Sequence, residues 1–250
     1  MRPIRLLAAV PAAVLLVAGC GEQSTPGSGT PAGSSSATGA SPSASGITAL
    51  SADQILAKAT AALQSAGSVR IKGTGGKGTE KFTIDLRYSG QNTDGKLGVG
   101  GQTIELRKLG RTVYLKASRA FWRSNGGEAA AQLLSGKWLK TPLDDKRFSG
   151  LSDLTDLRKA AKGVLEPDGK ITKGTEKTVN GQPAISLLTK GSDAGILWVA
   201  TTGDPRPVRI EPDPASGETG GLDFTGYGET VTVEAPPADL VVDVSKLGGN

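Results

Sequence analysis

Apolar and polar residues alternate along much of the first half of this chain, and this period of two constrains the fold more than any other feature. In one run, Phe82, Ile84, Leu86 and Tyr88 alternate with Lys81, Thr83, Asp85 and Arg87. Successive strand residues point to opposite faces, so the run predicts a strand with one buried and one solvated face. The alternation recurs around residues 69–71, 97–99, 104–106 and 113–115, with glycines near the turns. These repeats predict an antiparallel meander.

One strong helix is predicted before the meander. Ser51 and Gln54 form a capping box, and Leu50 and Ile55 occupy the two positions of a hydrophobic staple. The residues that then share one helical face are Ile55, Leu56, Ala59, Ala62, Leu63 and Ala66. Gly67 ends this helix.

The rest of the chain predicts helical inserts and a second block of strands. Short helices are expected near residues 128–134 and after Ser149. Strands are expected from residue 170 onward, with a type I′ hairpin at Asn180-Gly181. Further strands are expected at residues 195–201, 207–211, 222–227 and 231–233, with an edge strand at 240–244. The fold class is therefore α+β, with about ten strands in one domain.

The first twenty residues read as an export signal. Arg2 and Arg5 precede an apolar run that is too short to span a bilayer permanently. Ala18 and Gly19 directly precede Cys20, the only cysteine of the chain, as in a bacterial lipobox. We therefore expect residues 1–19 to be a signal peptide and Cys20 to carry acyl chains such as palmitate. The anchor predicts localisation on the outer face of the cytoplasmic membrane.

A low-complexity segment follows the predicted lipidation site. Nearly every residue from 21 to 46 is Ser, Thr, Gly, Ala or Pro, and Glu22 carries the only charge. Such a composition cannot offset the entropy of ordering, so we expect residues 20–48 to form a flexible tether. This composition is compatible with two roles. The segment could be a tether that lets the domain meet a partner, or it could be a passive spacer. Residues 49–250 are expected to be the folded domain.

Composition removes several classes of chemistry. The chain contains no histidine, which excludes Ser-His-Asp and Cys-His catalysis and the commonest zinc ligand. Without the predicted signal peptide the basic residues fall from 29 to 27 against 24 acidic ones, too small an excess to predict nucleic-acid binding. We expect no catalytic residue, no metal and no cofactor, and a monomeric chain.

Three kinds of motif resemble phosphate-binding or calcium-binding sequences, but turns explain each of them better. Residues 73–78 satisfy GxGxxG and residues 90–96 resemble a P-loop, but a strand rather than a helix follows each. The acid pairs Asp144-Asp145 and Glu211-Pro212-Asp213 lack calcium-loop spacing and are interpreted as solvated turn residues.

Taken together, these segments resemble the LppX/LprG/LprA-type lipoproteins, a family with a LolA-like fold. The resemblance rests on the lipobox and tether, the helix of residues 52–66 with its following strand, Gly136–Lys140, and residues 197–210 with the closing residues 227–237. It implies a strongly curved, incomplete antiparallel β-barrel with helices on the concave side. It also implies that lipid or glycolipid acyl chains are held between sheet and helices.

The predicted cavity residues lie on the apolar faces of the first helix, the second strand and the central insert. They are Leu56, Leu63, Phe82, Ile84, Leu86, Trp122, Leu133, Leu134 and Trp138. For Trp122 and Trp138, plain core packing is the favoured alternative to a place in a cavity wall. The alternative function is an envelope protein-interaction or regulatory scaffold without a cavity, because alternating strands also fit a well-packed sandwich.

Overall fold

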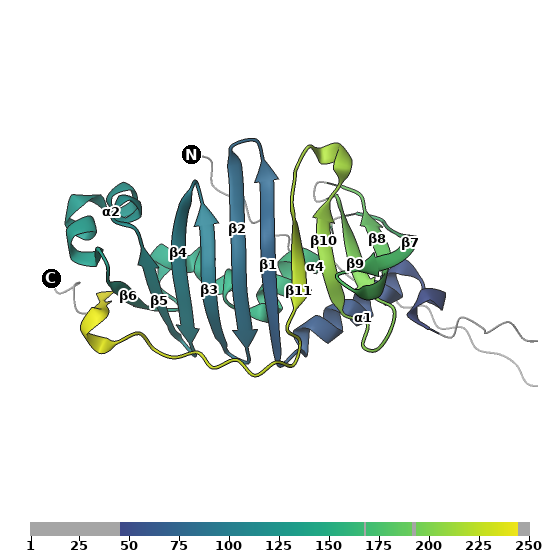
Figure 1. Cartoon of the computed structure of the whole chain (residues 1–250), viewed down its shortest axis with the longest axis horizontal. Helices are drawn as coiled ribbons and strands as arrows, with labels where there is room; N and C mark the ends of the chain where they lie inside the picture. Colours follow the sequence, from purple (N-terminus) through teal and green to yellow (C-terminus); the bar gives the residue numbers. More distant parts are fainter. Residues whose placement is uncertain (1–45, 168, 192–193, 245–250) are drawn as a thin grey trace, which may run out of the picture. The chain divides into compact units, whose positions relative to one another are not determined.

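The computed structural model describes residues 46–167, 169–191 and 194–244, which belong to one compact unit. Its centre is a curved, unclosed sheet of twelve strands (Figure 1). The first block contains β1 (Ser68–Lys77), β2 (Glu80–Ser89), β3 (Asn92–Val99), β4 (Gln102–Leu109), β5 (Thr112–Ala117) and β6 (Trp138–Pro142). The second contains β7 (Ile171–Val179), β8 (Gln182–Thr189), β9 (Gly195–Ala200), β10 (Pro207–Pro212) and β11 (Gly221–Thr225). The α+β, incomplete-barrel prediction is confirmed.

A single seam joins the two blocks of strands. Within each block, consecutive strands pair antiparallel, as the sequence predicted. The seam is the antiparallel pair β1–β11, with Ile71 opposite Phe224 and Gly73 opposite Leu222. The short strand β12 (Val241–Asp243) extends the β6 edge in parallel, so the predicted edge strand is present.

The helices lie on the concave side of the sheet. Figure 1 shows α1 (Ala52–Gln64) and α4 (Leu157–Leu165) behind the strands of the second block and the seam. The capping box of Ser51 and Gln54 is formed, which confirms the predicted start of α1. Ile55, Ala59 and Leu63 are fully buried in the main core, together with Leu86, Leu106 and Leu187 of the sheet. Burial of these apolar faces is the main stabilising contribution.

Two more helical segments complete the concave side. The central insert forms α2 (Arg119–Leu134), and η2 (Lys146–Phe148) leads into α3 (Ser149–Leu154). Three sheet side chains bind backbone carbonyls at the break between α3 and α4: the Tyr88 hydroxyl donates to Leu154 (2.7 Å), and Thr93 (2.8 Å) and Lys108 (3.3 Å) donate to Thr155. These bonds fix α3 and α4 against β2, β3 and β4. Burial lowers the pKa of Lys108.

Most local predictions are confirmed, and a few are wrong. Asn180 and Gly181 both have positive φ (50° and 78°), as a type I′ hairpin requires. Residues 73–78 and 90–96 belong to hairpins of β1–β2 and β2–β3, not to phosphate loops. The predicted strand at 231–233 is absent, because this stretch runs extended along the strand ends and pairs with no strand (Figure 1).

Two further corrections concern an acid and a helix. Glu211 lies within β10 and accepts hydrogen bonds from Trp198 and Arg209, so it is not a solvated turn residue. The central insert is helical from Arg119, earlier than predicted, because Ser118 caps it. The remaining short turns are η1 (Ile47–Ala49), η3 (Pro214–Ser216) and η4 (Ala238–Leu240).

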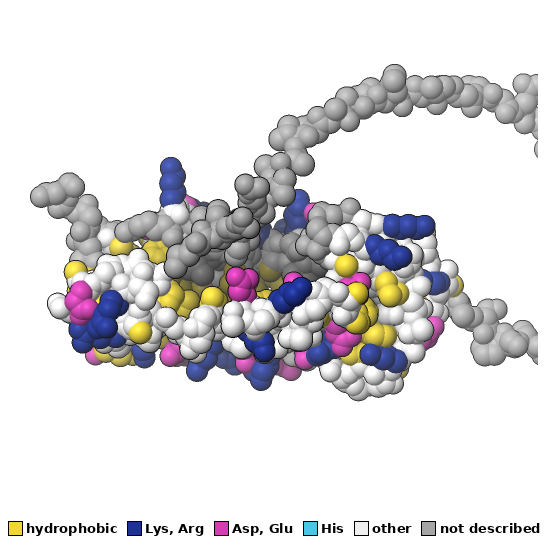
Figure 2. Space-filling view, turned by 90° about the horizontal axis from the view of Figure 1, so that it is seen from above, with side chains coloured by type: hydrophobic (Ala, Val, Ile, Leu, Met, Phe, Trp, Pro, Cys, Tyr) yellow, Lys and Arg dark blue, Asp and Glu magenta, His cyan; other side chains and the backbone are white. Residues whose placement is uncertain are grey.

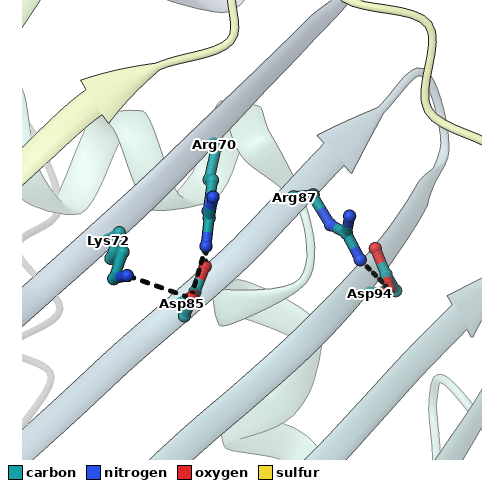
Figure 3. A network of polar contacts seen from close by, with 5 residues as sticks. All are labelled: Arg70, Lys72, Asp85, Arg87 and Asp94. Atoms are coloured by element: carbon teal, nitrogen blue, oxygen red, sulfur yellow. Dashed lines mark hydrogen bonds and ion pairs between the residues drawn. The ribbon is translucent and has the colours of Figure 1, made fainter.

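The convex face of β1, β2 and β3 is charged. Asp85 pairs with Arg70 at 2.7 Å and with Lys72 at 3.8 Å, and Arg87 pairs with Asp94 at 2.9 Å (Figure 3). The hydrogen bond from Arg70 lowers the pKa of Asp85. Viewed from the strand ends, hydrophobic side chains gather in the hollow, whereas charged ones follow the outer margin (Figure 2).

The seam generates a prediction at Gly73. A Cβ at this position would overlap the backbone carbonyl oxygen of Gly221 on β11. Gly73→Ala must push the two strands apart, and we expect it to lower the free energy of unfolding by about 2–3 kcal/mol. Urea denaturation measures the change.

Gly67→Ala is the matched control, because a Cβ at Gly67 meets no atom within 4 Å. Its effect should stay below about 1 kcal/mol. Equal stability of the two variants would contradict the close approach of β1 and β11.

Candidate functional site

The candidate site is a cavity of about 630 Å³ between α2 and the concave face of β4, β5 and β6. This volume lies in the range of small-molecule pockets. Its lining is apolar except at Trp122 and Asn125. The lining residues are Ile104, Leu115, Phe121, Trp122, Asn125, Gly126, Ala130, Leu133, Leu134, Leu139, Phe148, Gly150 and Val244.

The wall formed by the sheet follows directly from strand alternation. Ile104, Leu115 and Leu139 come from three adjacent strands, and Leu115 lies directly opposite Leu139 in the register. Their polar neighbours point to the convex face, where Lys116 and Lys140 are found. The same alternation that predicts the strands therefore supplies the apolar wall.

The opposite wall is a broken helix. Ser118 caps the start of α2 by accepting a hydrogen bond from the Phe121 amide (3.1 Å). Gly127 interrupts the helix with φ 80° and ψ −179°, a conformation essentially restricted to glycine. Glu128 then receives hydrogen bonds from both Arg119 and Arg123, which joins the two halves of α2 across the break. These two bonds lower the pKa of Glu128.

The break bends α2 over the end of the sheet instead of along it. On one side of Gly127, the rings of Phe121 and Trp122 stack edge to face, with centroids 5.1 Å apart. On the other side, Ala130, Leu133 and Leu134 line the same cavity. The two halves thus form two sides of one hollow.

Three of the nine predicted cavity residues line this space: Trp122, Leu133 and Leu134. Trp122 and Leu134 are almost completely buried, whereas Leu133 is 40% exposed. Leu133 therefore lies where the cavity opens to solvent.

Four predicted residues belong instead to the packed core. Leu63, Ile84 and Leu86 are buried, and Leu56 packs against them from α1. They belong to the buried cluster in which side chains fill the space between the helices and the sheet. Sequence periodicity assigned them to the concave side but could not distinguish a filled region from an open one.

Phe82 and Trp138 lie elsewhere again. Phe82 is 41% exposed near the end of β2, where its ring rests over Gly75. Trp138 is buried on the convex face, where Arg107 and Lys116 lie 4.9 and 5.8 Å from its ring centroid. Its neighbour Leu139 takes the cavity position.

Sequence reasoning missed the sheet wall and Ala130. Ile104 and Leu115 stood in runs that the alternation had already identified, so a signal existed for them. Nothing in the sequence indicated that α2 would cover these strands, rather than those of the seam.

Two other hollows are more polar. One of about 500 Å³ lies beside the end of α1, with Lys58, Asp204 and Arg206 in its lining. Another of about 260 Å³ lies around Arg206 and Glu229. Neither offers a continuous apolar surface, so the α2 cavity is the candidate site.

Within residues 46–167, 169–191 and 194–244, no helix is long and apolar enough to cross a bilayer. The same part of the chain contains no cluster of three or more His, Cys, Asp or Glu residues that could hold a metal ion. Cys20 lies outside the described residues.

Comparison with known proteins identifies the fold. No family model matches the sequence, and a search of curated proteins finds no match. Among solved structures, LprF from Mycobacterium bovis is similar with a TM-score of 0.52 and 17% identity, over 74% of this chain and 96% of LprF. This chain has the LolA-like fold of the LppX/LprG-type lipoproteins.

A second solved structure is the lipoprotein LppX from Mycobacterium tuberculosis. It has a TM-score of 0.48 and 16% identity over 73% of this chain and 99% of LppX. The similarity to LprF, with its TM-score of 0.52, confirms the predicted resemblance at the level of the fold. In this LolA-like fold, the α2 cavity lies on the concave side, between helix and sheet.

Proposed function

We propose that this protein is a membrane-anchored, exported lipoprotein that binds acyl chains of lipids or glycolipids in the α2 cavity, and that it is not an enzyme. The observation that carries the proposal is an apolar cavity of about 630 Å³ in a LolA-like sheet, beside a separate region of the concave side that buried side chains fill. Each methylene moved from water into such a cavity contributes about 0.8 kcal/mol. A lipid loses similar contacts on leaving a membrane, so binding and release can both occur.

An apolar path leads from the strand ends toward the cavity. Val99 is 59% exposed and lies directly opposite Phe82 in the β2–β3 register. Two residues further along β3, Leu97 lies opposite Ile104, which lines the cavity. We infer that this row of apolar side chains guides an acyl chain toward the cavity, which gives the exposed Phe82 a role.

The anchor and tether complete the proposal. Residues 1–19 are the signal peptide, acylated Cys20 holds the chain on the outer face of the cytoplasmic membrane, and residues 20–48 form the tether. At about 5–6 Å × √n, some 26 flexible residues reach about 25–30 Å. The domain, residues 49–250, can then approach lipids of its own membrane as a monomer.

The alternative of an envelope protein scaffold rests on the open edge of the sheet. β7 forms that edge, and six of its nine residues are exposed. However, its pairing with β8 is irregular between Lys173 and Glu176, and Lys177 adds a further charge. Irregularities and charges of this kind protect an edge from pairing with another chain, which favours the lipid proposal.

Filling the cavity tests the proposal. Ala130→Trp places a large ring in the α2 cavity, and we expect the affinity for the fluorescent fatty acid cis-parinaric acid to fall at least about tenfold, equal to ~1.4 kcal/mol. Fluorescence titration measures this affinity. The full chain carries Cys20→Ser, so that no acyl chain is attached to residue 20.

Ala129→Trp is the matched control, because Ala129 is the exposed neighbour outside the cavity lining. It should bind like the parent chain. Undiminished binding by a folded Ala130→Trp variant would place the lipid elsewhere, and no binding by the parent chain would refute the proposal.

The anchor has its own test. Cells that express the full chain should incorporate a clickable palmitate analogue into it, and Cys20→Ser should abolish the label because the thiol is the acceptor. Ser24→Ala, in the tether, should leave labelling intact. Label retained by Cys20→Ser would contradict anchoring at this residue.

A further inference from the structure

The α2 cavity has a limited capacity for hydrocarbon, which follows from its volume of about 630 Å³. A methylene group occupies about the same volume as a water molecule in the liquid, ~30 Å³. The cavity therefore has room for about twenty methylene groups, the length of one long acyl chain. Two chains of sixteen carbons would need roughly 960 Å³, which exceeds the space between α2 and the sheet.

Buried side chains close the cavity toward the middle of the sheet. Ile104 on β4 and Leu115 on β5 line the cavity. Leu106 lies two residues beyond Ile104, and Val113 lies two residues before Leu115, so both face the same side of the sheet. Both are almost completely buried and lie outside the cavity lining. The hollow therefore ends at Leu106 and Val113.

Hydrogen bonds hold the structure in place beyond this closed end. Lys108 lies opposite Val113 in the β4–β5 register and opposite Thr93 in the β3–β4 register. Lys108 and Thr93 both donate to the backbone carbonyl of Thr155, at 3.3 and 2.8 Å. The chain just before α4 is thus fixed against the sheet, which prevents the cavity from lengthening in this direction.

The remaining sides of the cavity are also occupied. Phe148, in η2, and Val244, which directly follows β12, belong to its lining. Leu133 is the lining residue that is 40% exposed, at the solvent-facing side of α2. A chain that enters past Leu133 therefore meets side chains at the far end, and its polar headgroup stays near the solvent.

We propose that the α2 cavity holds a single acyl chain of up to about twenty carbons, so that its ligand is a single-chain lipid, such as a fatty acid or a lysolipid. This inference rests on the proposed function and names its substrate class. A lipid with two chains would leave the second chain outside the cavity. There the row of Phe82 and Val99 covers one side of it at most, since Val99 is itself 59% exposed.

Counting bound chains tests the capacity. Radiolabelled palmitate is brought to saturation by equilibrium dialysis against the full chain carrying Cys20→Ser, with and without Ala130→Trp. The difference between the two binding numbers is the number of chains in the α2 cavity. We expect a difference of one, because a second palmitate exceeds the volume. A difference of two would overturn the inference and leave the proposed function standing.

The dependence of affinity on chain length provides a second measurement. Saturated fatty acids of increasing length displace cis-parinaric acid from the same parent chain. Each added carbon should raise the affinity about two- to fourfold until the cavity is full. Beyond about twenty carbons the affinity should stay level. An affinity that keeps rising past this length would overturn the inference, again without affecting the proposed function.

Two leucine variants show whether the α2 cavity sets this limit. Leu115→Ala removes an isopropyl group from the cavity wall, and the limit should move to chains about three carbons longer. Leu63→Ala is the matched control, because it removes the same atoms from the packed core, and it should leave the limit unchanged. An unchanged limit in a folded Leu115→Ala variant would overturn the inference.

Ala130→Leu gives the opposite change if Leu115→Ala fails to fold. It adds an isopropyl group to the lining, and the limit should fall by about three carbons. A limit that does not fall would contradict the inference. If the parent chain binds no fatty acid of any length, the proposed function fails and this inference fails with it.

Discussion

The structure depends on covering one apolar face of a long sheet. Twelve strands present aliphatic side chains on the concave side, and two helices, α1 and α4, pack on the seam and the second block. Hydrophobic burial explains that part fully. The β4–β6 end is covered by α2, which bends at Gly127 and leaves the hollow that we assign to a ligand. The proposed binding site is therefore a part of the sheet that the chain's own side chains leave open.

The two faces of the sheet have different roles. The convex face is held by ion pairs such as Arg70–Asp85, which contribute about 0–1 kcal/mol each when exposed but keep the surface solvated. The concave face supplies stability at one end and a binding surface at the other. A chain with one cysteine cannot form an internal disulfide, so apolar burial has to provide both the stability and the binding surface.

The sequence predicted local structure better than it predicted the site. Alternation around Ile84 identified strands and faces, and Ser51 and Gln54 identified the start of α1, because these signals are local. The β1–β11 seam joins residues about 150 positions apart, as in the pair Ile71 and Phe224, and no local pattern encodes it. Without the seam, the packing of α1 against α4, β7 and β10 could not be known. Leu63 and Leu86 were therefore assigned to a cavity, whereas both belong to the packed core.

The two tryptophans of the central insert show the same limit. Trp122 lines the α2 cavity, whereas Trp138 lies on the convex face, with Arg107 over its ring. Neighbouring residues of a strand point to opposite faces, so Leu139 points inward and Trp138 points outward. The bend at Gly127 decides the size of the hollow, and a glycine in a helical run does not by itself reveal a bend.

Native mass spectrometry of the purified full chain carrying Cys20→Ser tests the central claim most directly. The account predicts that a fraction of molecules carries a noncovalent adduct with the mass of a lipid, lost on organic extraction and regained on incubation with lipid vesicles. A single ligand-free mass, unchanged after that incubation, would contradict it.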